Sequence, residues 1–229
     1  MIRRVVRSAA SIAAALVSIA TIALPLETAG DTAKRAAIEI ASGSELWMEG
    51  KSTLHDWESR TNTLNVGFTI DPIRTEPIDA TGVDALVRAG GVLALDVEIP
   101  VKPLHSGKAG LDKNMMKALK AEQFPMIRFH MSRYTVTGPA TADTLSLSVV
   151  GELIVAGKNK PVTLEARAWQ CDAGVWVAGT APLNMTDFDI TPPTMMMGAI
   201  KTNNRIVIHY RLLLAPAGRL AGSGIQTAK

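Results

Sequence analysis

The sequence predicts an all-β fold, a sandwich or a closed antiparallel barrel with one short helix beside it. Apolar and polar residues alternate with a period of two through most of the chain after residue 44. Side chains on a strand point to opposite faces in turn, so each run has one apolar and one polar face. Turn-forming residues separate the runs at short spacing, which favours antiparallel neighbours because parallel strands need long crossovers. Only one segment shows a clear helical period.

The alternating runs are the predicted strands. Their apolar positions are Leu64, Val66, Phe68 and Ile70; Leu93, Leu95, Val97 and Ile99; Leu145, Leu147 and Val149; Val162, Leu164, Ala166 and Ala168; and Ile206, Ile208, Tyr210 and Leu212. The turn signals between them include Asp71-Pro72, Gly90-Gly91, Gly138-Pro139, Asp172-Ala173-Gly174 and Thr202-Asn203-Asn204. Many half-polar strands with few helices are typical of a sandwich or a barrel.

Residues 111–123 break the alternation and predict a short amphipathic helix, because their apolar side chains recur at helical spacing. Asp112 is the expected cap, and Phe124-Pro125 is expected to end the helix. A second helical turn is expected over residues 84–89.

The two ends of the chain are predicted to lie outside the folded domain. Residues 1–29 begin with arginines and continue as an apolar run, which by composition is a secretory signal peptide or an N-terminal membrane anchor. Residues 30–43 have the composition of a linker, and residues 216–229 that of a disordered tail. We therefore expect a folded domain over residues 44–215 and a periplasmic or secreted location.

The composition narrows the partners. The formal net charge is +3, and Arg3, Arg4 and Arg7 supply three positive charges at the N-terminus, so the rest of the chain is nearly neutral. No basic stripe with interleaved aromatic residues is present, so nucleic acid is not an expected partner. Cys171 is the only cysteine, so an intrachain disulfide cannot form. A disulfide between two chains is the remaining pairing, and a homodimer is one of the assemblies that the sequence allows.

The apolar faces of the strands decide what the interior contains. In a small closed barrel they point inward, where they either fill the interior or line a cavity for one ligand. Most are medium-sized aliphatic side chains, which favours a lined cavity for an elongated apolar guest. The predicted lining residues are Leu64, Val66, Phe68, Leu93, Leu95, Val97, Ile127, Phe129, Leu145, Leu147, Val149, Leu164, Ile206 and Ile208.

Four stretches carry a family resemblance. They read GKSTLHDWESRTNTLNVGF, GLDKNMMKALKAEQFPMIRFHMSRY, LSLSVVGELIVAGKNKPVTLEARAW and APLNMTDFDITPPTMMMGAIKTNNRIVIHYRLLL. As an ordered set, from about Ser44 to Ala215, they resemble the YceI-like family of exported lipid-binding proteins. The resemblance implies an extended lipocalin-like antiparallel barrel of about eight strands. It also implies an apolar pore that holds a polyisoprenoid lipid, such as an isoprenoid quinone, with no other cofactor.

Ser52, His55 and Asp56 supply the residue types of a hydrolase triad. Neighbours on an extended strand point to opposite faces, and no nucleophile elbow is present, so no catalytic residue is expected. We expect His55 and Trp57 at the mouth of the pore, with a simple turn as the alternative, and Asp56 at the surface.

The histidines and methionines allow two metal-site hypotheses, and neither is favoured. The four histidines, at positions 55, 105, 130 and 209, do not have ligand spacing. Met195, Met196 and Met197 could bind copper(I), but consecutive residues on an extended segment do not converge on one ion. These methionines are expected at the pore mouth, as an adaptable lid, or in ordinary packing.

Four lysines give the predicted helix a basic surface, at Lys108, Lys113, Lys117 and Lys120. This surface is either a solvated face or a site of transient contact with an anionic membrane. The sequence thus predicts a non-enzymatic lipid carrier, for carriage, storage or stress protection in the cell envelope. The alternatives are a packed exported barrel acting as a stress or interaction protein without ligand, and a hydrolase or metal site centred on His55.

Overall fold

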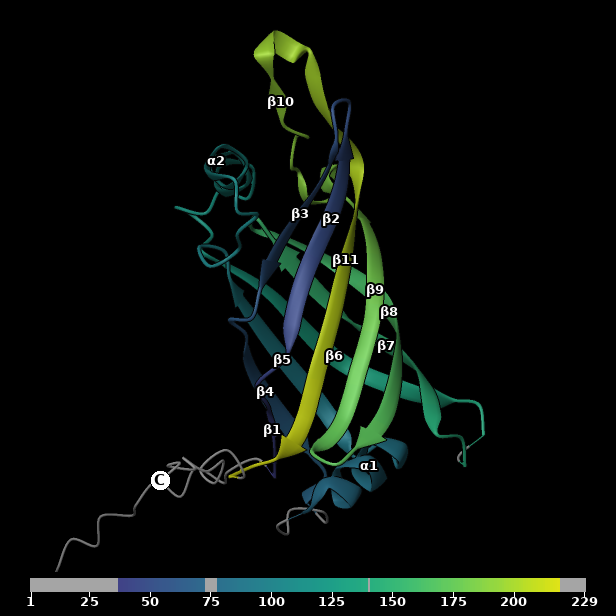
Figure 1. The fold of residues 1–229 in the computed structure, drawn as a ribbon. Helices are drawn as coiled ribbons and strands as arrows, with labels where there is room; N and C mark the ends of the chain where they lie inside the picture. Colours follow the sequence, from purple (N-terminus) through teal and green to yellow (C-terminus); the bar gives the residue numbers. More distant parts are fainter. Residues whose placement is uncertain (1–36, 73–77, 140, 219–229) are drawn as a thin grey trace, which may run out of the picture. The chain divides into compact units, whose positions relative to one another are not determined.

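The computed structural model describes residues 37–72, 78–139 and 141–218 (Figure 1). Along the chain its elements are β1 (Ile38–Ile40), β2 (Glu45–Ser52), β3 (Asp56–Thr61), β4 (Asn65–Ile70), α1 (Ala80–Arg88), β5 (Val92–Pro100), α2 (Ala109–Ala118), β6 (Met126–Thr137), β7 (Thr144–Val155), β8 (Lys158–Cys171), β9 (Gly174–Asn184), the 3-10 helix η2 (Met185–Phe188), β10 (Thr194–Met195), the 3-10 helix η3 (Met196–Gly198) and β11 (Ile200–Pro216).

The ends of the chain differ in part from the expectation. The predicted signal or anchor at residues 1–29 lies outside the described residues, as do residues 30–36 and 219–229. Part of the predicted linker is a strand, because β1 pairs with the end of β11, where Ile38 lies opposite Pro216. The Ile38 side chain is buried in the main core, which explains why this short segment is held in the sheet.

The strands form one curled antiparallel sheet, which confirms the predicted all-β fold. Nine strands follow one another across it, rather than about eight, in the order β3-β2-β11-β9-β8-β7-β6-β5-β4, and β1 and β10 pair with β11. Strands β6 to β9 are successive hairpins, whereas β11 returns to lie beside β2 from the start of the domain. The curl turns one face of every long strand toward a common interior (Figure 1).

The two edges of the sheet, β3 and β4, are not paired with each other in the part of the chain that the structure describes. The sheet is therefore a half-barrel rather than a fully closed one. Arg60 of β3 pairs instead with His105, and the two backbones exchange hydrogen bonds of 2.9 and 3.1 Å. The segment around His105 covers this edge, and the neighbouring Val101 and Leu104 are buried beneath it.

Two α-helices accompany the sheet. The expected helical turn at residues 84–89 is a nine-residue helix, α1, whose N-cap Asp79 accepts a 2.8 Å hydrogen bond from the backbone N–H of Gly82. No helix among the described residues is long and apolar enough to cross a membrane.

The second helix, α2, is shorter than expected and ends at Ala118, before the Phe124-Pro125 pair. The predicted cap is wrong: Lys108 occupies the N-cap position without a side-chain hydrogen bond. Asp112 lies inside the first turn, where its carboxylate accepts hydrogen bonds from the backbone N–H and the hydroxyl of Ser106, at 2.7 and 2.6 Å. The acidic side chain therefore anchors the preceding loop rather than the helix end.

Two clusters of buried side chains occupy the two ends of the half-barrel. One packs α1 against β7, β8, β9 and β11 through residues that include Leu86, Leu145, Ala168 and Val175. The other packs α2, η2 and the segment before α2 together, and includes Leu104, Met115, Met185 and Phe188. The interior between these clusters is not filled, and this space is the candidate site.

Candidate functional site

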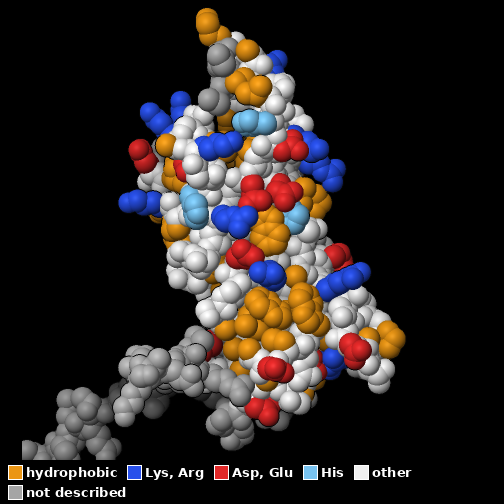
Figure 2. Space-filling model, in the orientation of Figure 1, with side chains coloured by type: hydrophobic (Ala, Val, Ile, Leu, Met, Phe, Trp, Pro, Cys, Tyr) orange, Lys and Arg blue, Asp and Glu red, His pale blue; other side chains and the backbone are white. Residues whose placement is uncertain are grey.

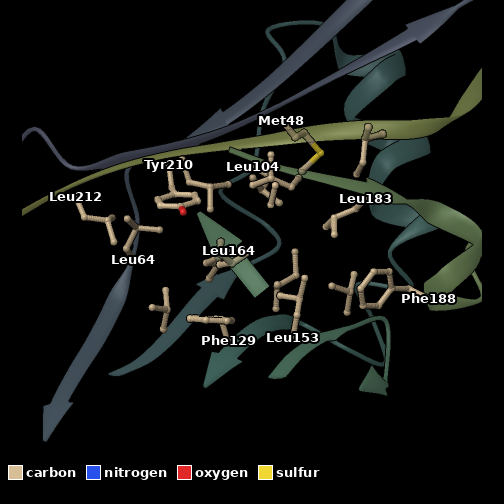
Figure 3. Close-up of a pocket in the computed structure, with 18 of the residues that line it drawn as sticks. Met48, Leu64, Leu104, Phe129, Leu153, Leu164, Leu183, Phe188, Tyr210 and Leu212 are labelled. Atoms are coloured by element: carbon tan, nitrogen blue, oxygen red, sulfur yellow. The ribbon is translucent and has the colours of Figure 1, made fainter. Parts of the chain in front are cut away.

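The half-barrel contains a long apolar cavity of ≈ 270 Å³ (Figure 3). Its wall on β11 runs from Ile206 to Leu214, with every second residue facing inward. The eight steps between these nine residues, at about 3.3 Å each, give this wall a length of roughly 26 Å. Residues from both helices and from β2 to β9 complete the lining. The cavity is therefore narrow for its length and suits an elongated guest better than a compact one.

Aromatic rings lie along the cavity wall because glycines on the neighbouring strands make room for them. Tyr210 is paired with Gly179, where a Cβ atom would lie 2.2 Å from the tyrosine hydroxyl. Trp57 is paired with Gly50, where a Cβ atom would lie 2.2 Å from the indole ring. A side chain larger than hydrogen at either glycine would push the ring inward. These pairings keep the interior open although aromatic residues line it.

No charged side chain lines the cavity among the described residues, and few polar ones do. Burial raises the pKa of Tyr210 to about 12, with the nearby Glu165 carboxylate acting in the same direction. The Tyr210 hydroxyl donates to the backbone oxygen of Glu165 at 3.2 Å. Tyr134 donates to the backbone oxygen of Val87 at 2.8 Å, and burial raises its pKa as well. Both hydroxyls are satisfied by backbone, so the middle of the cavity offers a guest mainly apolar contact.

The remaining polar lining gathers at the end that carries α2 and η2. Asn114 belongs to α2, Asn184 directly precedes η2, and Thr202 lies near the start of β11. The opposite end is closed by the packed cluster around α1. We therefore place the mouth of the cavity at the α2 and η2 end, where a polar group of a guest can meet side-chain amides and water.

The structure brings most of the predicted lining residues together around this cavity. Figure 3 shows three of them pointing into the same space: Phe129 from β6, Leu164 from β8 and Leu64 from the loop directly before β4. Their proposed role in lipid binding stays a prediction. The predicted residues that line the cavity are Leu64, Phe68, Leu95, Val97, Ile127, Phe129, Leu147, Val149, Leu164, Ile206 and Ile208.

Three predicted lining residues lie elsewhere. Leu93 is 49% exposed, because the pairing of β4 with β5 shifts by one residue there and turns Val92 inward in its place. Leu145 is buried in the cluster at the α1 end, below the cavity. Val66 is half-buried on β4 but does not reach the lining. The alternation predicted which strands face inward, but not where a bulge reverses the phase.

The sequence reasoning missed several lining residues. Strand β9 contributes Val177, Ala181 and Leu183, but its sequence is apolar in both phases, so alternation could not select a face. Strand β2 contributes Leu46 and Met48, which a period-two count over residues 46–50 could have found. The residues supplied by α2 and η2 depend on how those helices lie over the sheet, and no local pattern carries that information.

The predicted mouth residues His55 and Trp57 are placed differently. His55 is exposed in the β2–β3 turn, whereas Trp57 lines the cavity. The Ser52 hydroxyl donates to the backbone oxygen of His55 at 2.7 Å and accepts from two backbone N–H groups of the same turn. Ser52 therefore closes a turn and does not face the imidazole as a nucleophile would. The Trp57 indole nitrogen is buried without a hydrogen-bond partner among the described residues.

The predicted methionine lid is only partly described. The side chain of Met197 is fully exposed and does not line the cavity. The backbone of Met195 pairs with Ile200 in a small hairpin, but the side chains of Met195 and Met196 lie outside the described residues. Met197 thus projects from the mouth end instead of folding over it.

The histidines and the cysteine are dispersed over the domain. His130 contacts the Asp96 carboxylate at 2.6 Å on the exposed face of the sheet, and His209 stacks on Trp47 with ring centroids 4.9 Å apart. Within residues 37–72, 78–139 and 141–218, no group of three or more His, Cys, Asp or Glu side chains is arranged to hold a metal ion. Cys171 is half-buried at the end of β8 and carries a free thiol.

Comparison with known proteins identifies the fold. BcnA of Burkholderia cenocepacia superimposes with a TM-score of 0.58 at 17% identity, over 77% of this chain and 99% of BcnA. A polyisoprenoid-binding domain from Saccharophagus degradans, implicated in plant cell wall breakdown, superimposes with a TM-score of 0.56 at 12% identity, over 79% of this chain and 99% of that domain. At these identities the likeness shows the fold alone. No curated protein sequence matches the chain.

A family comparison goes further than the likeness in fold. The model of the YceI-like domain matches residues 41–212, which run from before β2 to Leu212 within β11 and include both α-helices. This range contains nearly all of the cavity lining. The chain therefore belongs to the YceI-like domain family.

Proposed function

We propose that this protein is a non-enzymatic carrier that holds an elongated, uncharged lipid of the polyisoprenoid class in the cavity of its half-barrel. The observation that carries the proposal is a cavity roughly 26 Å long on its β11 wall, with no charged lining residue among those described. A charged ligand would leave an unpaired charge in this space, whereas a hydrocarbon tail would leave nothing unsatisfied. The S. degradans domain of the same fold is described as polyisoprenoid-binding, which supports this class of ligand.

The energetics favour a long tail. Each methylene group moved from water into the cavity contributes about 0.8 kcal/mol, while association costs roughly 4–15 kcal/mol in lost freedom. A short apolar molecule cannot offset that cost, but a tail of several isoprene units can. The mouth, with Asn114, Asn184 and Thr202, is suited to a small polar head such as a quinone carbonyl or a hydroxyl.

The proposal is tested by identifying what the protein carries. Native mass spectrometry of the protein purified from its own host, followed by organic extraction, should reveal an isoprenoid lipid. A protein that is empty, and that also fails to take up added isoprenoid quinone, would contradict the proposal and favour a ligand-free exported barrel.

A pair of variants ties the lipid to the cavity. Leu147→Asp places a carboxylate in the lining and should abolish lipid retention, because the charge cannot be satisfied there. Leu93→Asp is the matched control, since Leu93 is exposed and outside the lining. Ala181→Phe fills the cavity without adding charge and should also reduce the retained lipid. Equal lipid content in Leu147→Asp and Leu93→Asp, both folded by circular dichroism, would show that the lipid binds elsewhere.

We also propose that the carrier acts outside the cytoplasm, in the cell envelope. The support is the arginine-led apolar run at residues 1–29. Fractionation of host cells, with N-terminal sequencing of the protein recovered, tests this. Recovery of the intact chain in the cytoplasm would contradict it.

A further inference from the structure

Two hairpin tips project from the mouth end of the half-barrel, and each presents a large apolar side chain to water. The β2–β3 turn carries Leu54, whose side chain is 68% exposed, and the β10–β11 turn carries the fully exposed Met197. Among the residues described, Leu93 is the only other exposed large hydrophobic residue, and at 49% it is less exposed than either. Figure 1 shows both tips at the end that carries α2, and Figure 2 shows a few separate hydrophobic side chains exposed at that end. Scattered single exposures are ordinary, but two on adjoining tips make a surface feature.

The two tips are joined, although about 145 residues separate them in the chain. The backbone N–H of Thr53 donates to the oxygen of Lys201 at 3.0 Å, and the N–H of Lys201 donates to the Thr53 hydroxyl at 3.1 Å. The same hydroxyl donates to the backbone oxygen of Ala199 at 3.3 Å. The hydrogen bonds of Thr53, together with the pairing of Ser52 with Thr202, therefore join the two turns into one unit that carries both Leu54 and Met197.

This unit stands directly at the mouth of the cavity. Lys201 is followed by Thr202, which lines the cavity and whose N–H donates to the backbone oxygen of Pro193, another lining residue, at 3.0 Å. A surface that the tips touch would thus lie against the opening through which a lipid must pass.

On the two tips and on α2, lysines outnumber carboxylates. The exposed acidic residues nearby are engaged: Asp56 pairs with Lys51, Asp189 pairs with Lys158, and Asp187 accepts from the Asn184 amide. The tips themselves, residues 52–55 and 194–201, contain Lys201 and His55 but no acidic residue. On α2, at the same end, Lys113 and Lys117 are exposed, and the carboxylate of Asp112 is engaged by Ser106. Figure 2 shows Lys and Arg side chains on this part of the molecule. Exposed aliphatic tips beside basic side chains match the surface of a bilayer that contains anionic lipids.

We propose that the protein docks mouth-first on an anionic lipid bilayer, with Leu54 and Met197 inserted at the level of the headgroups. Docking in this way places the cavity opening against the membrane, so that a tail can pass between bilayer and cavity without crossing water. The use of the docked state rests on the proposed function, but the docking itself does not. The apolar tips supply short-range insertion, and the lysines supply a longer-range attraction that salt weakens.

The test places an environment-sensitive nitrobenzoxadiazole dye at single positions of the full chain. In a Cys171→Ser background, Leu54→Cys, Met197→Cys and Leu93→Cys are each labelled and mixed with vesicles of phosphatidylglycerol and phosphatidylcholine. The emission of the dye should shift to the blue at positions 54 and 197 but not at 93. Because every variant keeps residues 1–29, any membrane binding by that segment is common to all and does not produce the difference.

A second measurement gives magnitudes. Co-flotation of Leu54→Ser and Met197→Ser with the same vesicles should show roughly tenfold weaker binding than Leu93→Ser. No blue shift at positions 54 and 197, or an equal shift at position 93, would overturn the docking. An equal shift with phosphatidylcholine alone would overturn the role given to anionic lipid.

Extraction of the unsubstituted protein in parallel separates this inference from the proposed function. Bound isoprenoid without insertion of the tips overturns the docking and leaves the carrier function standing. Insertion of the tips by a protein that holds no lipid overturns the carrier function and leaves the docking standing.

Discussion

The two ends of the half-barrel are each covered by a short helix, but the two helices have opposite effects. Helix α1 buries Val83 and Leu86 against the ends of the strands and closes the interior, and only its Val87 borders the cavity. Helix α2 buries only Met115 within its bounds, and its Leu111 and Asn114 face the cavity. A helix that packs on side chains forms a plug, whereas one that faces empty space forms the wall of an opening. The direction in which a guest enters follows from this difference.

The largest expected effect compares core truncations in the two helices. Leu86→Ala should lower the free energy of unfolding by about 2–5 kcal/mol, because it leaves a void in a packed cluster. Met115→Ala should lower it by less than half as much, because this side chain already borders a cavity. Urea unfolding of the two variants measures the difference. Equal losses would mean that the α2 end is packed as tightly as the α1 end.

The interior between the two ends can be probed through Tyr210. Because burial raises its pKa to about 12, the folded protein keeps the phenolic proton after the unfolded chain, with a pKa near 10.0, has lost it. The free energy of unfolding is therefore unaffected by Tyr210 below pH 10. It should fall by on the order of 2 kcal/mol between pH 10 and pH 12, because only the unfolded chain loses the proton there. Urea midpoints measured across this range, with Tyr210→Phe as the control, check the effect. A wild-type slope no steeper than that of Tyr210→Phe would mean that the cavity wall is wet at this position.

A third comparison is between two glycines: Gly179, which makes room for the Tyr210 ring in the cavity wall, and Gly67, which has no close neighbour on β4. At Gly179 a Cβ atom would lie 2.5 Å from the backbone oxygen of Glu165 as well as close to the Tyr210 hydroxyl, so Gly179→Ala should destabilise by roughly 1–3 kcal/mol and narrow the cavity. At Gly67 nothing lies within 4 Å, so Gly67→Ala should be close to neutral. Thermal unfolding and lipid content of both variants test this. A neutral Gly179→Ala variant with full lipid content would contradict the role given to the glycine.

The smallest expected effect concerns the helix caps. Asp79→Ala removes the N-cap of α1 and should cost about 1 kcal/mol, whereas Lys108→Asp supplies the cap that α2 lacks and should gain roughly 0.5–1 kcal/mol. Chemical denaturation checks both signs. A stabilising effect of Asp79→Ala would show that the α1 cap is strained rather than supportive.

The sequence predicted the inward faces well where strands are regular. On β11 every second residue from Ile206 to Leu214 lines the cavity, in the phase that the period-two count predicted, although Val207 between Ile206 and Ile208 is itself apolar. Prediction failed where local geometry changed the phase, as at Leu93, and where both phases are apolar, as in β9. It also failed for α2, because Asp112 satisfies a loop instead of the helix end. The phase change at Leu93 depends on the pairing of β5 with β4, and the role of Asp112 depends on the loop at Ser106, so neither can be read from the alternation of the segment itself.

The sequence by itself determined the antiparallel all-β architecture, the family and the uncharged character of the inward faces. These properties follow from period-two alternation, turn residues and ordered motifs, all of which are local. Only the tertiary structure decided that α1 plugs one end, that rings lie over Gly50 and Gly179, and that Thr53 joins two distant tips at the mouth. Each of these depends on which strands become neighbours when the sheet curls. The alternation of residues along the sequence predicts which face of a strand is buried, but it does not predict which helix or strand packs against that face.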